Sequence, residues 1–170
     1  MTHRTGRLTV ALAALAFLFA TAAPVMAGGD EPGWKPYARA VADAQENGRV
    51  VLVDVYTGWC GWCKKMDRDV YADARVRKYL AERYEIVKLD AEAATAHELD
   101  GRNLTERQIA TEFGVSSYPT TLFLASDGTL ITAVPGYVAA DKFLDVLEYI
   151  AGGLYKTQSW NAFLEAKKRR

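Results

Sequence analysis

Two cysteines, Cys60 and Cys63, are the only ones in this 170-residue chain. They follow an apolar run at 50–56 and open a stretch with helical character. The first turn of a helix has unpaired backbone N–H groups and the positive end of the helix dipole, which favour a thiolate at Cys60. Cys63 lies on the same helical face, close enough to form a disulfide. The pattern indicates a redox dithiol.

A structural disulfide and a metal site are the alternatives for this pair. A disulfide between residues three positions apart closes too small a loop to stabilise a fold much. Zinc usually takes four ligands, whereas the chain after residue 27 offers two cysteines and His97. We therefore predict no metal and no cofactor, and we expect His97 to be a loop histidine without a special role.

The N-terminus has the pattern of a secretory signal peptide. Arg4 and Arg7 precede an apolar run at 8–23, and small residues suited to cleavage follow at 24–27. We predict a signal peptide at 1–27. We expect the protein to contact a membrane only through this segment, during export. The alternative is an uncleaved anchor, although the run is short for a membrane span. In either case the cysteines reach an extracytoplasmic, periplasmic-type compartment, where disulfides persist.

The remaining chain is predicted to form a flexible lead-in at 28–36 and one domain at 37–170. The chain has 21 basic and 21 acidic residues, which does not suggest a nucleic-acid partner. The basic end at 167–170 is expected to be a frayed helix terminus rather than a membrane contact.

Hydrophobic periodicity predicts an α/β fold. The strands are expected at 50–56 and 84–90 and in a hairpin at 121–134, and 50–56 lacks polar alternation, as a strand buried on both faces does. Helices are expected at 36–47, at 61–83 with a break at 69–73, at 105–113, at 141–150 and at 159–168. No clear period appears at 91–103. This order predicts a mixed sheet of four to five strands with helices on both faces.

From about residue 37 to 150 the chain resembles the thioredoxin superfamily. The resemblance rests on the active-site segment with an acid six residues before the first cysteine, on the next strand, on a Tyr-Pro-Thr sequence and on a glycine after the hairpin. These features are the segment 53–64, the strand 87–90, Tyr118-Pro119-Thr120 and Gly136. The Gly-Trp dipeptide between the cysteines, the long stretch at 91–103 and the tail after Gly153 are closer to exported thioredoxin-like proteins of bacteria.

The resemblance implies roles for the pair and for Asp54. Cys60 would attack a substrate disulfide, and Cys63 would then release the substrate by attacking Cys60. Asp54 interrupts an apolar strand, where burial raises the pKa of a carboxyl, and the resemblance makes it the proton acceptor for Cys63; otherwise it lies partly wet at the strand edge. Lys88 either pairs with Asp54 or reaches solvent.

The resemblance also implies a substrate groove. It predicts a cis Tyr118–Pro119 bond facing the cysteines, whose backbone pairs with an extended substrate segment. Tyr118 would line this groove, and Gly136 would lie beside it. We expect Trp62 to be exposed and to contact protein substrates, and Trp59 to support the core.

These inferences predict an exported thiol–disulfide oxidoreductase, a reductant rather than an oxidant, that acts on cysteines or disulfides of other proteins. Its electrons would be exchanged with a partner dithiol protein. Two alternatives stay open at this point, namely a thiol metal carrier and a non-catalytic binding module built on the same fold.

Overall fold

The computed structural model describes residues 1–2, 32–99 and 101–169. Apart from its first two residues, the predicted signal peptide lies outside these ranges, as does the start of the predicted lead-in. Within them, none of the helices has the length and apolar character needed to cross a membrane.

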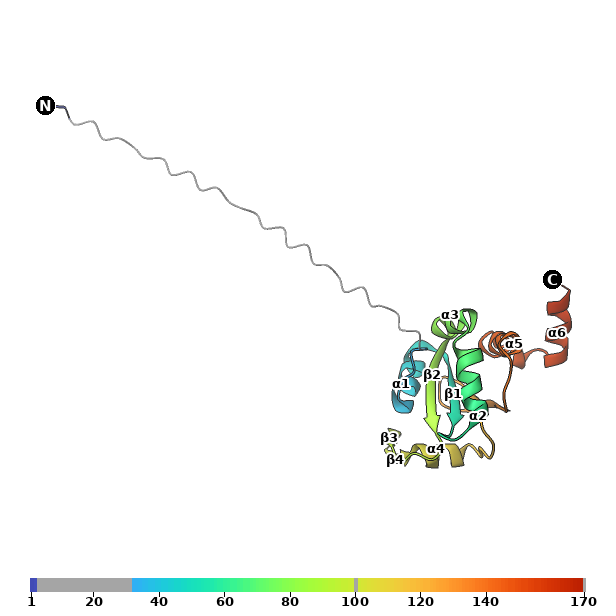
Figure 1. Cartoon of the computed structure of the whole chain (residues 1–170). Helices are drawn as coiled ribbons and strands as arrows, with labels where there is room; N and C mark the ends of the chain where they lie inside the picture. Colours follow the sequence, from blue (N-terminus) through green and yellow to red (C-terminus); the bar gives the residue numbers. More distant parts are fainter. Residues whose placement is uncertain (3–31, 100, 170) are drawn as a thin grey trace.

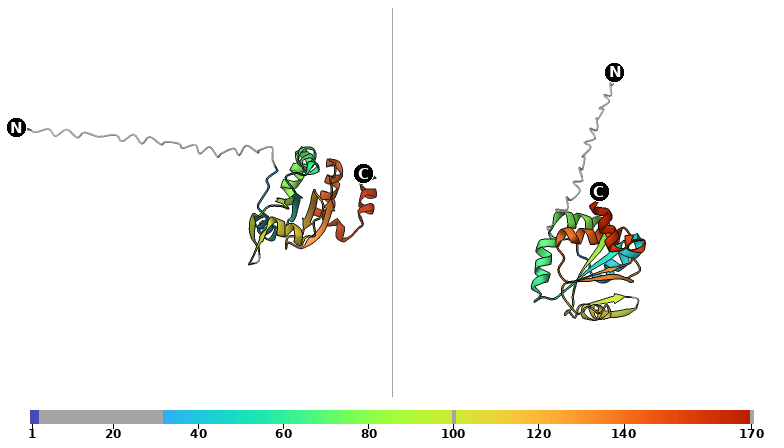
Figure 2. Two further views of the ribbon diagram at one scale, coloured as in Figure 1. Left: turned by 60° about the horizontal axis from the view of Figure 1, so that its bottom comes forward. Right: turned by 90° about the vertical axis from the view of Figure 1, so that its right-hand side faces the viewer.

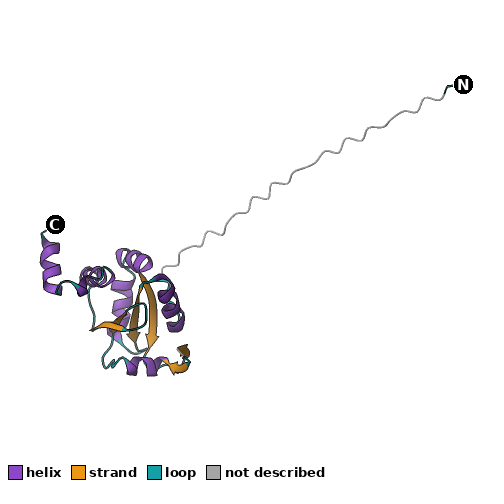
Figure 3. Cartoon of the chain, turned by 180° about the vertical axis from the view of Figure 1, so that it is seen from behind, coloured by secondary structure: helices purple, strands orange, loops and turns teal. Residues whose placement is uncertain are grey.

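A four-stranded mixed sheet lies at the centre of the molecule (Figures 1 and 3). Its strands, in spatial order, are β2 (Tyr84–Asp90), β1 (Val50–Tyr56), β5 (Thr120–Leu124) and β6 (Leu130–Pro135). Strands β1 and β2 are parallel, whereas β5 is antiparallel to both β1 and β6. The predicted mixed α/β sheet is confirmed, with four strands.

Helices cover both faces of this sheet (Figure 2). They are α1 (Tyr37–Asn47), α2 (Gly61–Met66), a π-helical turn (Asp67–Tyr71), α3 (Ala74–Arg83), α4 (Glu106–Glu112), α5 (Ala140–Ala151), a 3₁₀ turn (Leu154–Lys156) and α6 (Trp160–Lys168). Helices α1 and α4 enclose one apolar core with the sheet, and α2, the π-helical turn, α3 and α5 enclose the other.

Strand β1 separates the two cores. Val51, Val53 and Val55 belong to the core under α1, and Leu52 belongs to the core under α3 and α5. Because side chains alternate along a strand, Asp54 shares the face of Leu52. The sequence of β1 therefore delivers a carboxylate into the core beneath the helix that begins at the cysteines.

The stretch with no clear period contains a second sheet that the sequence analysis did not predict. Strands β3 (Ala96–Leu99) and β4 (Arg102–Thr105) pair antiparallel, and Gly101 turns the chain between them with a φ of 73°. Leu99 and Leu104 of these short strands pack against the core under α1, but the other side chains are mostly polar, so the sequence shows little apolar alternation. The prediction of His97 as a loop residue was wrong: it lies on β3, with its Nε2 3.2 Å from Glu106 Oε1.

The structure also differs from the predictions at the two ends of the domain. In the predicted lead-in, the Trp34 ring packs edge-on against Tyr71, and the backbone of Lys35 forms an isolated parallel β-bridge with Val87 of β2. At the C-terminal end, Lys167 is not frayed, because its Nζ lies 2.6 Å from both Asp145 and Glu148 of α5. The predicted break after the cysteines is confirmed by the π-helical turn and by the Asp73 cap of α3.

Candidate active site

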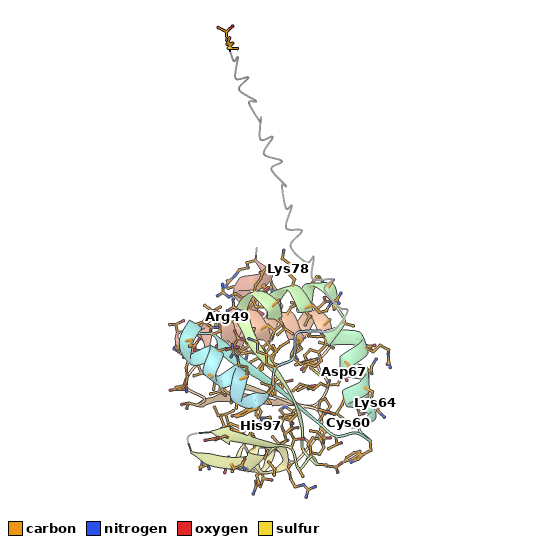
Figure 4. The ribbon with its side chains drawn as sticks, turned by 90° about the vertical axis from the view of Figure 1, so that its left-hand side faces the viewer. Arg49, Cys60, Lys64, Asp67, Lys78 and His97 are labelled. Atoms are coloured by element: carbon orange, nitrogen blue, oxygen red, sulfur yellow. A yellow bond between two sulfur atoms is a disulfide. The ribbon has the colours of Figure 1, made fainter. Side chains whose placement is uncertain are left out.

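The cysteine pair lies after β1, at the start of α2. Cys60 is the N-cap residue of α2, and its Sγ accepts a hydrogen bond from the backbone N–H of Cys63 at 3.0 Å. The two cysteines form a disulfide with their Cα atoms 5.3 Å apart. Backbone N–H groups at a helix start favour negative charge, so this sulfur is the one that the fold prepares to be a thiolate. Figure 4 shows Cys60 at the end of the domain away from Lys78.

Two exposed tryptophans flank a nearly buried disulfide. Cys60 is 4% exposed and Cys63 is 2% exposed, whereas Trp59 and Trp62 are 67% and 58% exposed. The exposure of Trp62 is confirmed. The prediction that Trp59 supports the core was wrong, since its ring lies on the surface and its Nε1 donates to Glu92 at 3.0 Å.

The Tyr118-Pro119 segment lies beside the active-site segment. The Tyr118–Pro119 peptide bond is cis, as predicted. The Tyr118 ring meets Trp59 edge-on at 6.0 Å between centroids, which places this turn next to the residue before Cys60. Gly136, with a φ of 84°, donates its N–H to the Pro119 carbonyl at 2.7 Å. Three chain segments distant in sequence thus meet around the disulfide.

Tyr137 completes this surface, and the sequence analysis did not identify it. Its ring lies 5.6 Å from the Trp62 ring, and the Lys65 ammonium lies 5.2 Å from its centroid. Its position directly after Gly136, a predicted groove residue, is the sequence signal that could have identified Tyr137. The disulfide is therefore bordered by one aromatic pair on the Tyr118 side and another on the Tyr137 side.

Asp54 is buried behind the disulfide helix. It is 1% exposed, and neither carboxylate oxygen receives a hydrogen bond from the described residues. Burial raises the pKa of this carboxyl to about 6, although the nearby Lys88 ammonium opposes the rise. Lys88 Nζ lies 3.2 Å from Asp54 Oδ2, so of the two alternatives for Lys88 the ion pair is the one that forms.

Lys88 is shared with a second carboxylate, that of Asp67 on the π-helical turn. Its ammonium also lies over the rings of Trp34, Tyr56 and Tyr71, at 5.2, 5.1 and 5.6 Å from their centroids. Asp67 was not among the predicted site residues, although it follows Cys63 by four residues and so lies on the same helical face.

An open cavity connects this charged group with the surface. It has a volume of about 430 Å³, and Lys88, Asp67, Tyr71 and Trp34 line it. Asp67 is 43% exposed at its side chain, against 1% for Asp54. Burial and the charge of Asp54 raise the pKa of the Tyr71 hydroxyl well above its usual value, so Tyr71 stays protonated here. The Lys88 and Asp67 side chains that adjoin Asp54 thus border this cavity, whereas Asp54 itself is not among its lining residues.

The geometry favours sulfur chemistry over metal binding. Among residues 1–2, 32–99 and 101–169, no group of three or more His, Cys, Asp or Glu side chains is arranged to hold a metal ion. His97 instead contacts Glu106 and the Tyr37 ring. The metal-carrier alternative therefore has no support from the described residues.

Comparisons with known proteins agree with this geometry. Residues 37–151 match the family model of the thioredoxin-like domain. The thiol:disulfide interchange protein DsbD of Ralstonia nicotianae is 37% identical over 114 residues, which are 66% of this chain and 17% of that protein. A DsbD of Yersinia pestis is 32% identical over 115 residues, 66% of this chain and 18% of that protein. The chain thus spans less than a fifth of the length of these relatives.

Solved structures show the same fold. The C-terminal domain of Neisseria meningitidis DsbD in its oxidised form aligns with a TM-score of 0.52 and 26% identity, covering 65% of this chain and 89% of that one. A thioredoxin-fold protein from Helicobacter pylori aligns with a TM-score of 0.66 and 21% identity, covering 72% and 86%. With its disulfide-bonded cysteine pair at the start of α2, the chain belongs to the thioredoxin-like family.

Proposed function

We propose that this protein is a thiol–disulfide oxidoreductase that works outside the cytoplasm as a reductant of disulfides in exported proteins. The observation that carries the proposal is the Cys60–Cys63 disulfide on the first turn of α2, beside the cis Tyr118–Pro119 bond. The signal-peptide pattern at 1–27 supports export. The similarity to proteins described as thiol:disulfide interchange proteins supports the reaction class.

The reduced protein would begin with Cys60. Its thiolate attacks one sulfur of the substrate disulfide, so that a Cys60–substrate bond forms and the substrate S–S bond breaks. The displaced substrate sulfur leaves as a thiolate and takes a proton from water. The N–H of Cys63, 3.0 Å from Cys60 Sγ in the disulfide form, is placed to stabilise the starting thiolate.

Cys63 would complete the exchange. Asp54 accepts the proton of the Cys63 thiol, directly or through water, and its pKa of about 6 makes it a suitable base near neutral pH. The Cys63 sulfur then attacks Cys60, forming the intramolecular disulfide and releasing the second substrate thiolate. The protein dithiol has lost the two electrons that the substrate gained, and a partner dithiol protein must restore them.

The substrate would dock across the turn that contains Pro119. The backbone of Tyr118 can pair with an extended segment of the substrate by strand addition. Tyr118 and Trp62 offer aromatic faces on the two sides of Cys60, and Gly136 borders the same turn without a side chain. Lys64 and Lys65, on α2, would favour the thiolate only weakly because both reach solvent.

The roles of the two cysteines are tested by trapping. Cys63→Ala is expected to hold substrate proteins on Cys60 as mixed disulfides, because nothing remains to attack that bond, whereas Cys60→Ala should hold almost none. The measurement is non-reducing gel electrophoresis of the exported fraction, followed by mass spectrometry of the captured proteins. Equal trapping by both variants would show that the assignment of attacker and resolver is wrong.

The direction of electron flow is tested by the reduction potential against glutathione. A value of about −270 mV, as in thioredoxin, marks a reductant, and about −120 mV marks a strong oxidant. Stoichiometric zinc or copper retained by the reduced protein would instead identify a thiol metal carrier. Failure to reduce insulin or glutathione disulfide, with no trapped partner, would identify a non-catalytic binding module.

A further inference from the structure

We propose that an apolar groove between β6, α5 and α6 binds an extended segment of the partner protein that flanks its reactive cysteine. This proposal rests on the proposed function and specifies its partner. The groove has a volume of about 480 Å³. Its lining includes Val134, Tyr137, Val146, Tyr149 and Trp160, with Lys142 as the charged member. The segment it fits carries apolar side chains and a carboxylate.

The groove is continuous with the active site through one side chain. Tyr137 lines the groove, and the same ring packs against Trp62, two residues after Cys60, at 5.6 Å. Pro135 also lines the groove and pairs with Thr120, the residue after Pro119. A polypeptide that docks over the Pro119 turn can therefore run past Tyr137 into the groove without leaving the surface.

The sheet favours an extended occupant. Strand β6 lies at the edge of the four-stranded sheet, with β5 as its one neighbour there. Edge strands present backbone N–H and C=O groups that can pair with an added strand. Thr132 and Val134 of β6 both line the groove, so an extended segment can align with the strand and place alternate side chains inside.

The C-terminal helix builds the far wall of the groove. Helix α6 lies beyond α5 at the side of the domain (Figures 1 and 2) and follows the last residue, 151, of the thioredoxin-like family match. The Trp160 ring packs against Tyr149 at 5.3 Å and against Phe163 at 5.5 Å. The groove is therefore partly made by a segment outside the family domain, as expected of a feature that selects a particular partner.

Charge on the groove specifies the partner further. Lys142 is exposed on α5 and forms no ion pair with any residue in the described ranges. By contrast, Lys167 is paired with Asp145 and Glu148 of α5. The ammonium of Lys142 is thus the cation available to a ligand at this site, which is why the proposed segment includes a carboxylate.

The test uses peptides in which one cysteine is activated as a mixed disulfide with thionitrobenzoate. One peptide has a Gly/Ser tail, a second ends in Val-Leu-Glu and a third in Val-Leu-Lys, each with spacers of increasing length. In the full chain carrying Cys63→Ala, the Cys60 thiolate attacks the peptide sulfur. The Cys60–peptide bond forms, the bond to thionitrobenzoate breaks, and the released thionitrobenzoate thiolate gives the rate.

We expect the Val-Leu-Glu peptide to react about tenfold faster than the Gly/Ser peptide at the best spacer length, since two apolar side chains leave water. Adding Trp160→Ala should reduce this ratio to about two or less. Adding Lys142→Glu, an exposed substitution that does not threaten the fold, should reverse the preference between the Glu and Lys peptides. Leu130→Ala, an exposed apolar change on β6 outside the groove, is the matched control and should keep the tenfold ratio.

The outcomes separate this proposal from the proposed function. If the peptides react equally, yet faster than they react with reduced glutathione, the exchange activity stands and the groove proposal is overturned. If none reacts faster than with glutathione, the proposed function itself fails. A ratio that survives both groove substitutions also overturns the proposal. So does a wild-type dimer, seen by sedimentation and dissociated by Trp160→Ala, because it would assign the groove to a second copy of the chain.

Discussion

At the scale of single residues, burial of Asp54 sets its proposed role as a base against the stability of the fold. Its carboxylate lies in an apolar core without a hydrogen bond from the described residues, and Lys88 is its ion-pair partner. A pKa raised from 3.8 to about 6 means that the folded state prefers the protonated form. The charged form of Asp54, which the proposed mechanism uses to activate Cys63, is therefore destabilising at neutral pH.

Asp54→Asn is expected to stabilise the protein at pH 7 by about 3 kcal/mol, since about two pKa units are worth roughly that much. Well below pH 3.8 the carboxyl is neutral in both folded and unfolded states, so the effect disappears there. Between pH 4 and 6 the folded state keeps a proton that the unfolded state loses, so wild-type stability falls as pH rises.

Urea unfolding of the oxidised protein at pH 4 and at pH 7 measures this prediction. The difference between Asp54→Asn and wild type should be large at pH 7 and should shrink at pH 4. A variant that is less stable than wild type at pH 7 would contradict the assigned burial cost. Lys88 keeps Asp67 as its partner in the variant, so a newly unpaired ammonium does not complicate the comparison.

At the scale of elements, the π-helical turn positions the charges beneath the disulfide. It continues α2 and places the Asp67 carboxylate in an ion pair with Lys88. Lys88 lies on β2, directly opposite Asp54 of β1. Asp67 therefore competes with Asp54 for one ammonium, and its own negative charge raises the pKa of Asp54. The pKa of Asp54 is therefore set jointly by residues of two strands and one helical turn.

Asp67→Asn is expected to lower the pKa of Asp54, because a negative charge is removed and Lys88 is left with one carboxylate. The rate at which Cys63 releases a trapped substrate should rise with pH through about 6 in wild type, and in the variant this rise should move to lower pH. Stopped-flow measurement of release between pH 4 and 8 gives both midpoints. Asp69→Asn is the matched control, since Asp69 pairs with Lys65 and Arg68 instead, and an equal shift in it would exclude the Lys88 explanation.

The elements also show what sequence patterns capture. The strand at 50–56, the helix that begins after Thr105 and the hairpin at 121–134 depend on local chemistry, and each forms as predicted. The β3–β4 hairpin was missed because its four-residue strands are mostly polar, with Leu99 and Leu104 as the residues that pack against a core. The exposure of Trp59 was also missed, since it depends on Glu92 and Tyr118, which are far away in the sequence.

At the scale of the whole molecule, the domain and its C-terminal helix are separable. The two cores on the sheet draw on residues from Tyr37 to Ile150, which matches the extent of the thioredoxin-like family model. Helix α6 belongs to neither core, and Tyr149 with Phe163 and the ion pairs of Lys167 hold it against α5. A helix at 159–168 was predicted, but not where it docks, because docking depends on contacts between surfaces.

Phe163→Ala is therefore expected to release α6 without unfolding the domain. Phe163 is 8% exposed and is the one buried residue of α6, so its loss removes the main apolar contact of that helix. Hydrogen exchange should become fast at 160–168 while β1 stays protected, since local opening requires less free energy than global unfolding. Phe143→Ala, which empties a fully buried site in a central core, should instead lower global stability by about 3 to 5 kcal/mol and speed exchange throughout. If Phe163→Ala deprotected β1 as strongly as Phe143→Ala, α6 would be an integral part of the fold rather than an attached wall of the groove.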